Sequence, residues 1–236
     1  MQLMVKGAMG MKVDMKRQIE RDMHNLTEEI IAKALIDKKA ITLNARSPFT
    51  FVSGIKSPIY TDNRKMIGFP KERETIVDYI VKKLEGRDYD VIAGTATAGI
   101  PWAAWVADKV KKPMAYIRSE KKGHGAGKQI EGSDVSGKKV MVVEDLISTG
   151  GSSMRSVEAC REAGGIVDCI VAIFSYGFEK AEKKFEEGRC KAEVLVDFDC
   201  LVKTAEKMGA ISSDELIIVL EWNKDPSGWG PKHGFA

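Results

Sequence analysis

The chain has 236 residues, of which 44% are hydrophobic and 30% charged, a composition typical of globular proteins that bury a substantial core. Its 37 basic and 34 acidic residues leave a formal net charge of +3 and are spread along the sequence, which argues against a nucleic-acid or anionic-membrane partner. Four cysteines without a C-x-x-C pair, and only three histidines, give little support for a zinc cluster and indicate reduced thiols in a cytoplasmic protein.

The N-terminal region divides into two parts. Residues 1–13 show no periodicity and are expected to be a flexible tail, whereas residues 14–236 are expected to form one domain. Lys6, Lys12 and Asp14 interrupt the apolar residues, so no signal-peptide core is recognised. From residue 14 to residue 38 apolar side chains recur every three or four positions, which predicts a helical arm packed on the main domain.

Residues 40–65 break this helical period. Residues 41–43 and 49–52 are rich in β-branched and aromatic side chains and predict the two strands of a hairpin, and residues 53–58 read as a turn. By itself Lys56 is more simply a solvated turn lysine than a ligand contact.

The next segment predicts a helix, a strand and a second helix. Residues 72–84 have one apolar face, residues 90–94 form an apolar strand, and residues 102–110 form an apolar helix. The small residues 95–99 between strand and helix would let the backbone approach a ligand closely, although on spacing alone a tight strand-to-helix connection is the better explanation.

A long polar loop is predicted after the strand at residues 113–117. Residues 118–132 gather basic side chains among four glycines, so we interpret them as a lid whose cations close over an anion. The alternative is a solvated loop without a function.

Residues 140–153 carry the most informative pattern of the chain. Val140–Val143 predicts a strand buried on both faces, Glu144 and Asp145 are expected just after its carboxyl end, and a turn rich in hydroxyls and glycines leads into a helix over residues 153–163. Backbone N–H groups at a helix start suit a phosphate, and the carboxylates suit ribose hydroxyls or magnesium. Neither a Walker A loop nor a dinucleotide fingerprint is present, and an ordinary strand, turn and helix is the simpler alternative.

The rest of the chain continues the alternation. Strands are predicted at residues 166–174 and 192–196, helices at 179–187, 199–208 and from Ser212 or Ser213 to Trp222, and an irregular tail at 223–236. The expected fold class is therefore α/β, with a mainly parallel twisted sheet flanked by helices.

Two motifs resemble one enzyme family. Residues 140–153 resemble the motif with which phosphoribosyltransferases bind 5-phosphoribosyl 1-diphosphate (PRPP). The pattern Phe-x-x-x-Ser-Gly-x-x-Ser-Pro-x-Tyr-x-Asp-x-Arg, from Phe49 to Arg64, resembles the N-terminal signature of orotate phosphoribosyltransferases. The resemblance implies a phosphoribosyltransferase-like fold, with an N-terminal helix, a β-hairpin hood over the base at about residues 40–65 and a mobile catalytic lid at about residues 118–132.

The same resemblance implies the activity. It is the Mg²⁺-dependent transfer of the phosphoribosyl group from PRPP to orotate, which gives orotidine 5′-monophosphate and diphosphate on the route to UMP. A homodimer that shares the lid loop between subunits is expected from the family. The alternatives are a phosphoribosyltransferase for another base and a non-catalytic PRPP-sensing regulator.

The resemblance also implies the site residues. Catalysis would involve Lys122, His124 and Asp145. Orotate would contact Ser148 and Lys56, and Mg²⁺ would be held mainly by PRPP. The residues that would bind PRPP are Lys56, Arg118, Lys122, His124, Glu144, Asp145, Leu146, Ile147, Ser148, Thr149, Gly150, Gly151 and Ser152.

Three positions depart from the family pattern. Ala98 and Ser119 stand where many members have lysine, and Tyr176 lies where many have an arginine for orotate. Orotate would then be held by other groups, such as the Ser148 turn and backbone amides under the hood.

Overall fold

The computed structural model describes residues 25–51, 53–120 and 129–235. The predicted tail at residues 1–13 and the first part of the predicted N-terminal helix lie outside them. The helix is present over residues 25–37.

A six-stranded sheet forms the centre of the fold, in the order β10-β9-β8-β5-β6-β7. Its strands are β5 (Val91–Thr95), β6 (Met114–Ile117), β7 (Ile130–Gly132), β8 (Val140–Ile147), β9 (Cys169–Ser175) and β10 (Lys191–Val196). All neighbouring strands are parallel except β7, which runs antiparallel to β6. The predicted α/β class with a mainly parallel sheet is confirmed.

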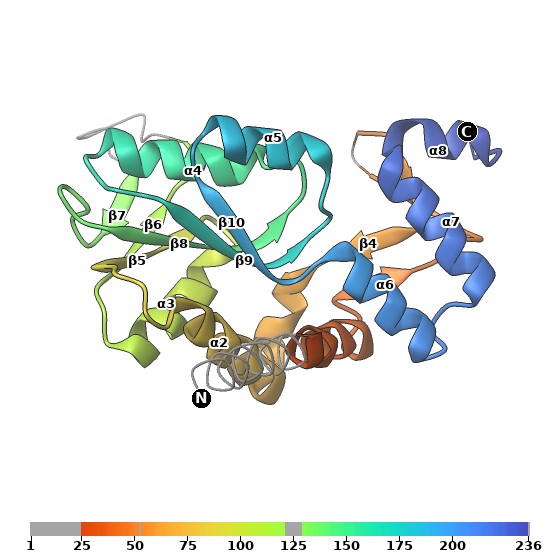
Figure 1. The fold of residues 1–236 in the computed structure, drawn as a ribbon, viewed down its shortest axis with the longest axis horizontal. Helices are drawn as coiled ribbons and strands as arrows, with labels where there is room; N and C mark the ends of the chain where they lie inside the picture. The colour runs from red at the N-terminus through yellow and green to blue at the C-terminus, as the bar shows by residue number, and fades with distance from the viewer. Residues whose placement is uncertain (1–24, 52, 121–128, 236) are drawn as a thin grey trace, which may run out of the picture.

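Helices cover both faces of this sheet (Figure 1). On one face lie α4 (Gly151–Glu162) and α5 (Glu179–Glu187), and on the other lie α2 (Pro70–Leu84) and α3 (Gly99–Val110). The last three helices, α6 (Phe198–Lys207), α7 (Ser213–Lys224) and α8 (Pro226–Lys232), follow β10 and lie to one side of the sheet. Because side chains alternate along a strand, Val140 and Val142 of β8 pack toward α4 and α5, whereas Met141 and Val143 pack toward α2 and α3. The continuous apolar run at the start of β8 is therefore explained by burial on both faces.

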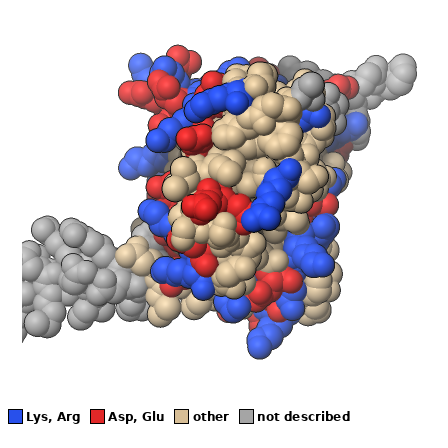
Figure 2. All heavy atoms as spheres, turned by 90° about the vertical axis from the view of Figure 1, so that its right-hand side faces the viewer, with Lys and Arg blue, Asp and Glu red and all other residues tan. Residues whose placement is uncertain are grey.

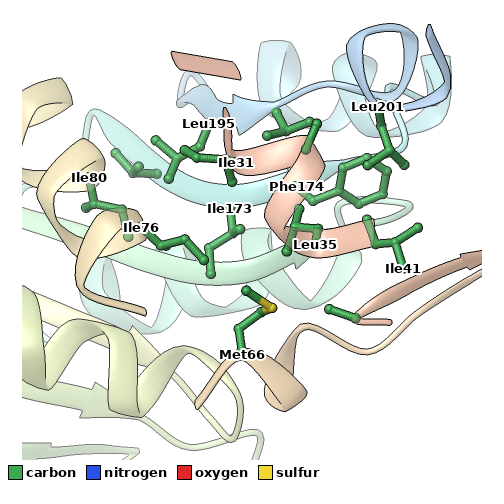
Figure 3. Packing of buried hydrophobic residues seen from close by; sticks show 14 of the residues in the cluster. Ile31, Leu35, Ile41, Met66, Ile76, Ile80, Ile173, Phe174, Leu195 and Leu201 are labelled. Carbon is green, nitrogen blue, oxygen red and sulfur yellow. The ribbon is translucent and has the colours of Figure 1, made fainter. Parts of the chain in front are cut away.

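The larger of the two apolar cores joins the sheet to the N-terminal segments (Figure 3). Ile76 and Ile80 of α2 face Ile173 of β9, and Leu35 of the helix at residues 25–37 lies beside Met66. All five side chains are fully buried. This core fixes the N-terminal segments against the α2 side of the sheet.

The segment expected to be a hairpin is built differently. β1 (Ile41–Leu43) pairs with β4 (Ile59–Thr61), and β2 (Phe49–Thr50) pairs with β3 (Lys56–Ser57), both antiparallel. The predicted pairing of residues 41–43 with residues 49–52 is therefore wrong, because each strand finds its partner later in the chain. The short helix η1 (Asn63–Gly68) follows β4 and leads into α2. We call residues 40–65 the hood segment.

Three further predictions need correction. The polar loop after β6 contains the strand β7, which the sequence pattern did not indicate because it is only three residues long. The C-terminal tail is not irregular, since α8 begins at Pro226 and the side chain of Asp225 accepts a hydrogen bond from the Gly228 N–H. α3 begins at Gly99, three residues before the predicted start, so Pro101 lies in its first turn.

The chain changes direction across the sheet between β5 and β8. From β5 it proceeds to β6 on one side, and from β8 it proceeds through β9 to β10 on the other. Ligands of open α/β sheets bind beyond the carboxyl ends of the strands at such a switch point. A ligand is therefore expected to bind beside the residues that follow β5 and those that end β8.

The molecular surface on the side of α6, α7 and α8 shows acidic and basic side chains mixed together (Figure 2). None of the helices within the described ranges combines the length and apolarity that crossing a bilayer requires.

Candidate active site

The end of β8 projects beyond its neighbour β5. Pairing with β5 stops at Gly94↔Val143, whereas pairing with β9 continues to Ile147↔Ser175. Glu144 and Asp145 therefore lie inside the strand, not after it as predicted, on a stretch that pairs with β9 but no longer with β5. The amide Nδ2 of Asn63 in η1 donates a 2.7 Å hydrogen bond to the carbonyl oxygen of Asp145 on this stretch.

Because side chains alternate along a strand, Glu144 and Asp145 leave the backbone of β8 on opposite faces, although their carboxyl groups remain close enough to interact. Glu144 is only 4% exposed and lies toward α4, where its side chain accepts hydrogen bonds from the Ser153 hydroxyl (3.4 Å) and from the Asp145 N–H (3.2 Å). Asp145 faces the hood segment and lines a pocket. The two acids that the sequence treats as a pair are therefore placed for different tasks.

That pocket, of about 380 Å³, lies between the hood segment, the turn after β5 and the end of β8. Its lining residues are Thr61, Asp62, Arg64, Thr97, Ala98, Asp145 and Leu146. The guanidinium Nε of Arg64 donates a 2.6 Å hydrogen bond to Asp62 Oδ1. A carboxylate and a guanidinium thus share one pocket at the switch point of the sheet, which suits a ligand carrying both hydroxyl and anionic groups.

Burial changes the titration of both acids. The pKa of Glu144 is raised to about 8. The main cause is burial away from water, and the second is the negative charge of the neighbouring Asp145. Burial also raises the pKa of Asp145, although hydrogen bonds and the positive charge of Arg64 act in the opposite direction. The two neighbouring acids therefore hold a proton more readily than two separate, exposed carboxyl groups would.

Glycines allow α3 to begin directly against β8. A Cβ on Gly99 would lie 2.5 Å from the carbonyl oxygen of Val143, and a Cβ on Gly94 would lie 2.7 Å from the carbonyl oxygen of Gly99. The peptide bond between Ala96 and Thr97 is cis. The small residues predicted to admit a ligand thus also let the start of α3 pack closely against the backbones of β5 and β8. This close packing places Thr97 and Ala98 at the pocket.

The turn after β8 presents the start of α4. Gly150 is the N-cap with φ of +71°, and no side chain caps the helix. A Cβ on Gly150 would lie 3.2 Å from Ala181 Cα, so both its conformation and its surroundings favour glycine. The N–H groups of the first turn are left available to an anion, with Ser148 half-buried and Thr149 and Ser152 exposed beside them.

Leu146 lines the pocket, whereas Ile147 is buried in the core.

Other residues predicted from the sequence lie apart from this pocket. Lys56 lines a different pocket of about 570 Å³ with Phe235, and its carbonyl oxygen accepts a 3.0 Å hydrogen bond from the indole N–H of Trp222. Arg118 follows β6, and its guanidinium lies 3.8 Å from Glu131. Lys122 and His124 lie outside the described residues.

Tyr176 shows what replaces the arginine expected in that region. Its ring is buried, stacks on Phe178 with centroids 5.2 Å apart, and meets Trp222 edge to face. Its hydroxyl donates a 2.9 Å hydrogen bond to Thr61, which lines the pocket. Tyr176 does not line the pocket itself but is hydrogen-bonded to a side chain that does.

The sequence interpretation missed the contribution of Thr61, Asp62 and Arg64 to the pocket. All three lie within the Phe49–Arg64 signature, so the motif was recognised but not its individual side chains. Their position opposite Asp145 follows from the β1–β4 ladder and from the Asn63 hydrogen bond, which no spacing in the sequence indicates.

Comparisons with known proteins give a consistent result. The family model of the phosphoribosyl transferase domain matches residues 71–198. A curated orotate phosphoribosyltransferase of Listeria innocua is 48% identical over 205 residues, covering 86% of this chain and 98% of its own length. Among solved structures, the orotate phosphoribosyltransferase of Aeropyrum pernix is similar with a TM-score of 0.65 and 29% identity, over 77% of this chain and 99% of its own. The UMP synthase of Leishmania donovani matches with a TM-score of 0.71 and 28% identity, over 83% of this chain but 42% of its own.

Proposed function

The chain belongs to the orotate phosphoribosyltransferase family, and from this premise we propose how its residues divide the work of the reaction. The enzyme transfers the 5-phosphoribosyl group of PRPP to orotate, which gives orotidine 5′-monophosphate and diphosphate. As the bond to diphosphate breaks, positive charge develops on the ribose ring and negative charge on the leaving group. Orotate is already an anion, so positioning and electrostatic stabilisation dominate over general-base catalysis.

The 5′-phosphate of PRPP binds at the turn after β8. The uncapped N–H groups of α4 point at this turn, and the hydroxyls of Ser148, Thr149 and Ser152 supply further donors. Gly150 and Gly151 keep side chains away from the phosphate. This assignment rests on the position of the turn at the carboxyl end of β8.

Asp145 is the acid that contacts the ribose. Its carboxylate lines the pocket, where it accepts hydrogen bonds from ribose hydroxyls and stabilises the developing positive charge. Glu144 faces the opposite side of the strand and supports the turn through Ser153. It acts on the ribose through the position of Asp145 more than through direct contact.

Magnesium fits this site as an ion carried mainly by the substrate. Within the described residues no group of three or more acidic, histidine or cysteine side chains is placed to hold a metal, whereas the carboxylate of Asp145 borders the pocket. Mg²⁺ commonly binds one or two carboxylates together with substrate phosphates. When bound, it would neutralise charge on the diphosphate oxygens.

Lys122 and His124 form the closing cations of the lid. Closure brings them to the departing diphosphate and keeps water from the ribosyl cation. Arg118 and Gln129 mark the ends of this segment, since the Arg118 N–H donates a 2.9 Å hydrogen bond to the Gln129 carbonyl oxygen. A homodimer in which the lid of one subunit completes the site of the other is part of this proposal.

Orotate binds under the hood segment, with the ring near Thr61 and its polar groups near Ser148 and backbone amides. Lys56 contacts orotate or PRPP only when its side chain leaves the pocket that it shares with Phe235. The reaction belongs to pyrimidine biosynthesis leading to UMP. The four cysteines are all free thiols, which supports a cytoplasmic location.

The observation that carries this assignment of roles is the carboxylate of Asp145 in the pocket at the switch point. We expect Asp145→Asn to lower kcat by about 100-fold or more without unfolding the protein. Asp108→Asn, which removes an exposed carboxylate paired with Lys111 on α3, should leave kcat unchanged. Full activity of Asp145→Asn would remove this residue from the mechanism.

A panel of bases tests the acceptor separately from the residue roles. Diphosphate release from PRPP should be observed with orotate and not with adenine, hypoxanthine or uracil. Equal turnover with a purine would contradict orotate specificity, and inactivity with every base would point to a PRPP-sensing regulator.

A further inference from the structure

We propose that Arg64 binds the diphosphate of PRPP. The turn after β5, residues 96–98, has no cationic side chain, and Arg64 supplies the positive charge there. This inference rests on the proposed function, because it assigns a further residue to the same pocket. Arg64 is the one cationic side chain among the described residues that line this pocket, which Thr97 and Ala98 also line.

Arg64 is held in place while most of its donors remain available. Its Nε donates to Asp62 Oδ1, and the Asp62 side chain is 18% exposed whereas that of Arg64 is 64% exposed. Its two terminal Nη groups donate no hydrogen bond to the rest of the described chain. Asp62 thus orients the guanidinium and leaves the paired N–H groups that bind phosphate oxygens in two-point contacts.

The opposite wall of the pocket also favours a multiply charged anion. α3 begins at Gly99 with Ala98 as its N-cap, and no side chain caps it. The positive end of a helix of twelve residues therefore faces the same space as the guanidinium. A diphosphate carries several negative charges, so it is attracted more strongly to the guanidinium and to the helix end than is the single carboxylate of orotate.

The geometry of the substrate agrees with this placement. Asp145, proposed to hold the ribose hydroxyls, lines the same pocket as Arg64, and the positive charge of Arg64 acts on Asp145. The diphosphate is attached to C1 of that ribose, adjacent to its 2-hydroxyl. A ribose bound at Asp145 therefore places its diphosphate within the pocket that Arg64 borders.

The decisive variants are Arg64→Gln and Arg64→Lys, with Arg46→Gln as the matched control. Arg46 is also an exposed arginine of the hood segment whose Nε pairs with a carboxylate, that of Glu215 at 3.1 Å, but it does not line the pocket. For each protein, the forward reaction gives KM for PRPP and for orotate. The reverse reaction gives KM for diphosphate, and calorimetry measures binding of magnesium diphosphate directly.

We expect Arg64→Gln to lower kcat/KM for PRPP and the affinity for diphosphate by about 10- to 100-fold, the effect of losing hydrogen bonds to a charged group. Arg64→Lys should lose less, and KM for orotate should change by less than about twofold in both. Ala98→Lys in the Arg64→Gln background should recover part of the lost diphosphate affinity, because residue 98 faces the same pocket. Arg46→Gln should match the unaltered enzyme.

Two results would overturn the inference. One is unchanged PRPP and diphosphate constants in Arg64→Gln. The other is a raised KM for orotate alone, which would assign Arg64 to the acceptor. Activity of the unaltered enzyme with orotate, measured in the same series, separates these outcomes from a failure of the proposed function.

Discussion

The hydroxyl of Tyr176, just after β9, donates a 2.9 Å hydrogen bond to the side-chain oxygen of Thr61 in β4. The Tyr176 carbonyl oxygen in turn accepts a 2.7 Å hydrogen bond from Nδ2 of Asn223 in α7. One buried residue therefore connects the central sheet, the hood segment and the C-terminal helices. Because Thr61 lines the pocket, this connection sets the position of one of its walls.

Tyr176→Phe should weaken the hood without destroying the aromatic cluster. Loss of one buried hydrogen bond should lower the free energy of unfolding by about 1 kcal/mol. Loss of the constraint on Thr61 should raise the KM values by a few fold, with a smaller change in kcat. Urea unfolding and steady-state kinetics measure the two effects. Tyr79→Phe, on α2, is the control, and identical behaviour of the two variants would mean that the Thr61 contact has no role.

Sequence periodicity predicted most of the central sheet because its strands are long enough to show an apolar run. β5, β8 and β9 are fully or mostly buried, so their composition alone indicates strands. β7 and the hood strands have only two or three residues, too few to establish a period. Their pairing depends on contacts formed between distant segments, such as Ile41 with Thr61.

The site was predictable to the level of motifs and not to the level of side chains. Glu144 and Asp145 were recognised together, yet the strand continues through them and turns only Asp145 to the pocket. Arg64 and Ala98 belong to separate motifs, and only the folded chain shows that they border one space. The raised pKa of Glu144 likewise depends on burial that a sequence does not display.

Gly99→Ala should damage both stability and activity. The added Cβ would lie 2.5 Å from the Val143 carbonyl oxygen, so either α3 or β8 must move. Overpacking of this kind costs about 1–3 kcal/mol of unfolding free energy. The movement should also displace Thr97 and Ala98 and raise KM for PRPP.

Gly68→Ala is the matched control for this substitution, since Gly68 is exposed and has open space around its Cβ position. It should change the unfolding free energy by less than about 1 kcal/mol. Unaltered stability and kinetics of Gly99→Ala would mean that the close approach of α3 to β8 is not required.

Lys122→Ala should lower turnover far more than it weakens PRPP binding. A lid cation that reaches the diphosphate as its charge grows stabilises the transition state more than the bound substrate. Lys121→Ala is the natural control, because the neighbouring lysine lies outside the family pattern of Arg118, Lys122 and His124. Steady-state kinetics with PRPP decide the matter, and a raised KM with unchanged kcat would count against the lid mechanism.

Glu144 should make the stability of the ligand-free protein fall as pH rises. Its pKa is raised by burial from its ordinary value of 4.5 to about 8 in the folded state. Between these two values the folded protein therefore binds more protons than the unfolded chain. The stabilising contribution is fully present below the unfolded pKa and is lost as pH rises through the folded one. A tenfold difference in proton affinity between the folded and unfolded states corresponds to about 1.4 kcal/mol.

Glu144→Gln tests this dependence, because glutamine imitates the protonated acid at every pH. The free energies of unfolding of the variant and the unaltered protein should differ little at pH 5. By pH 8.5 the variant should be more stable by roughly 1–4 kcal/mol. At this pH the folded unaltered protein must either ionise a buried carboxylate or keep it protonated at a low proton concentration, and both cost free energy. Urea titrations at several pH values, without PRPP, measure this difference, and comparing the two proteins cancels the other titrating groups. A constant difference across the range would show that Glu144 titrates in the folded protein as it does in the unfolded chain.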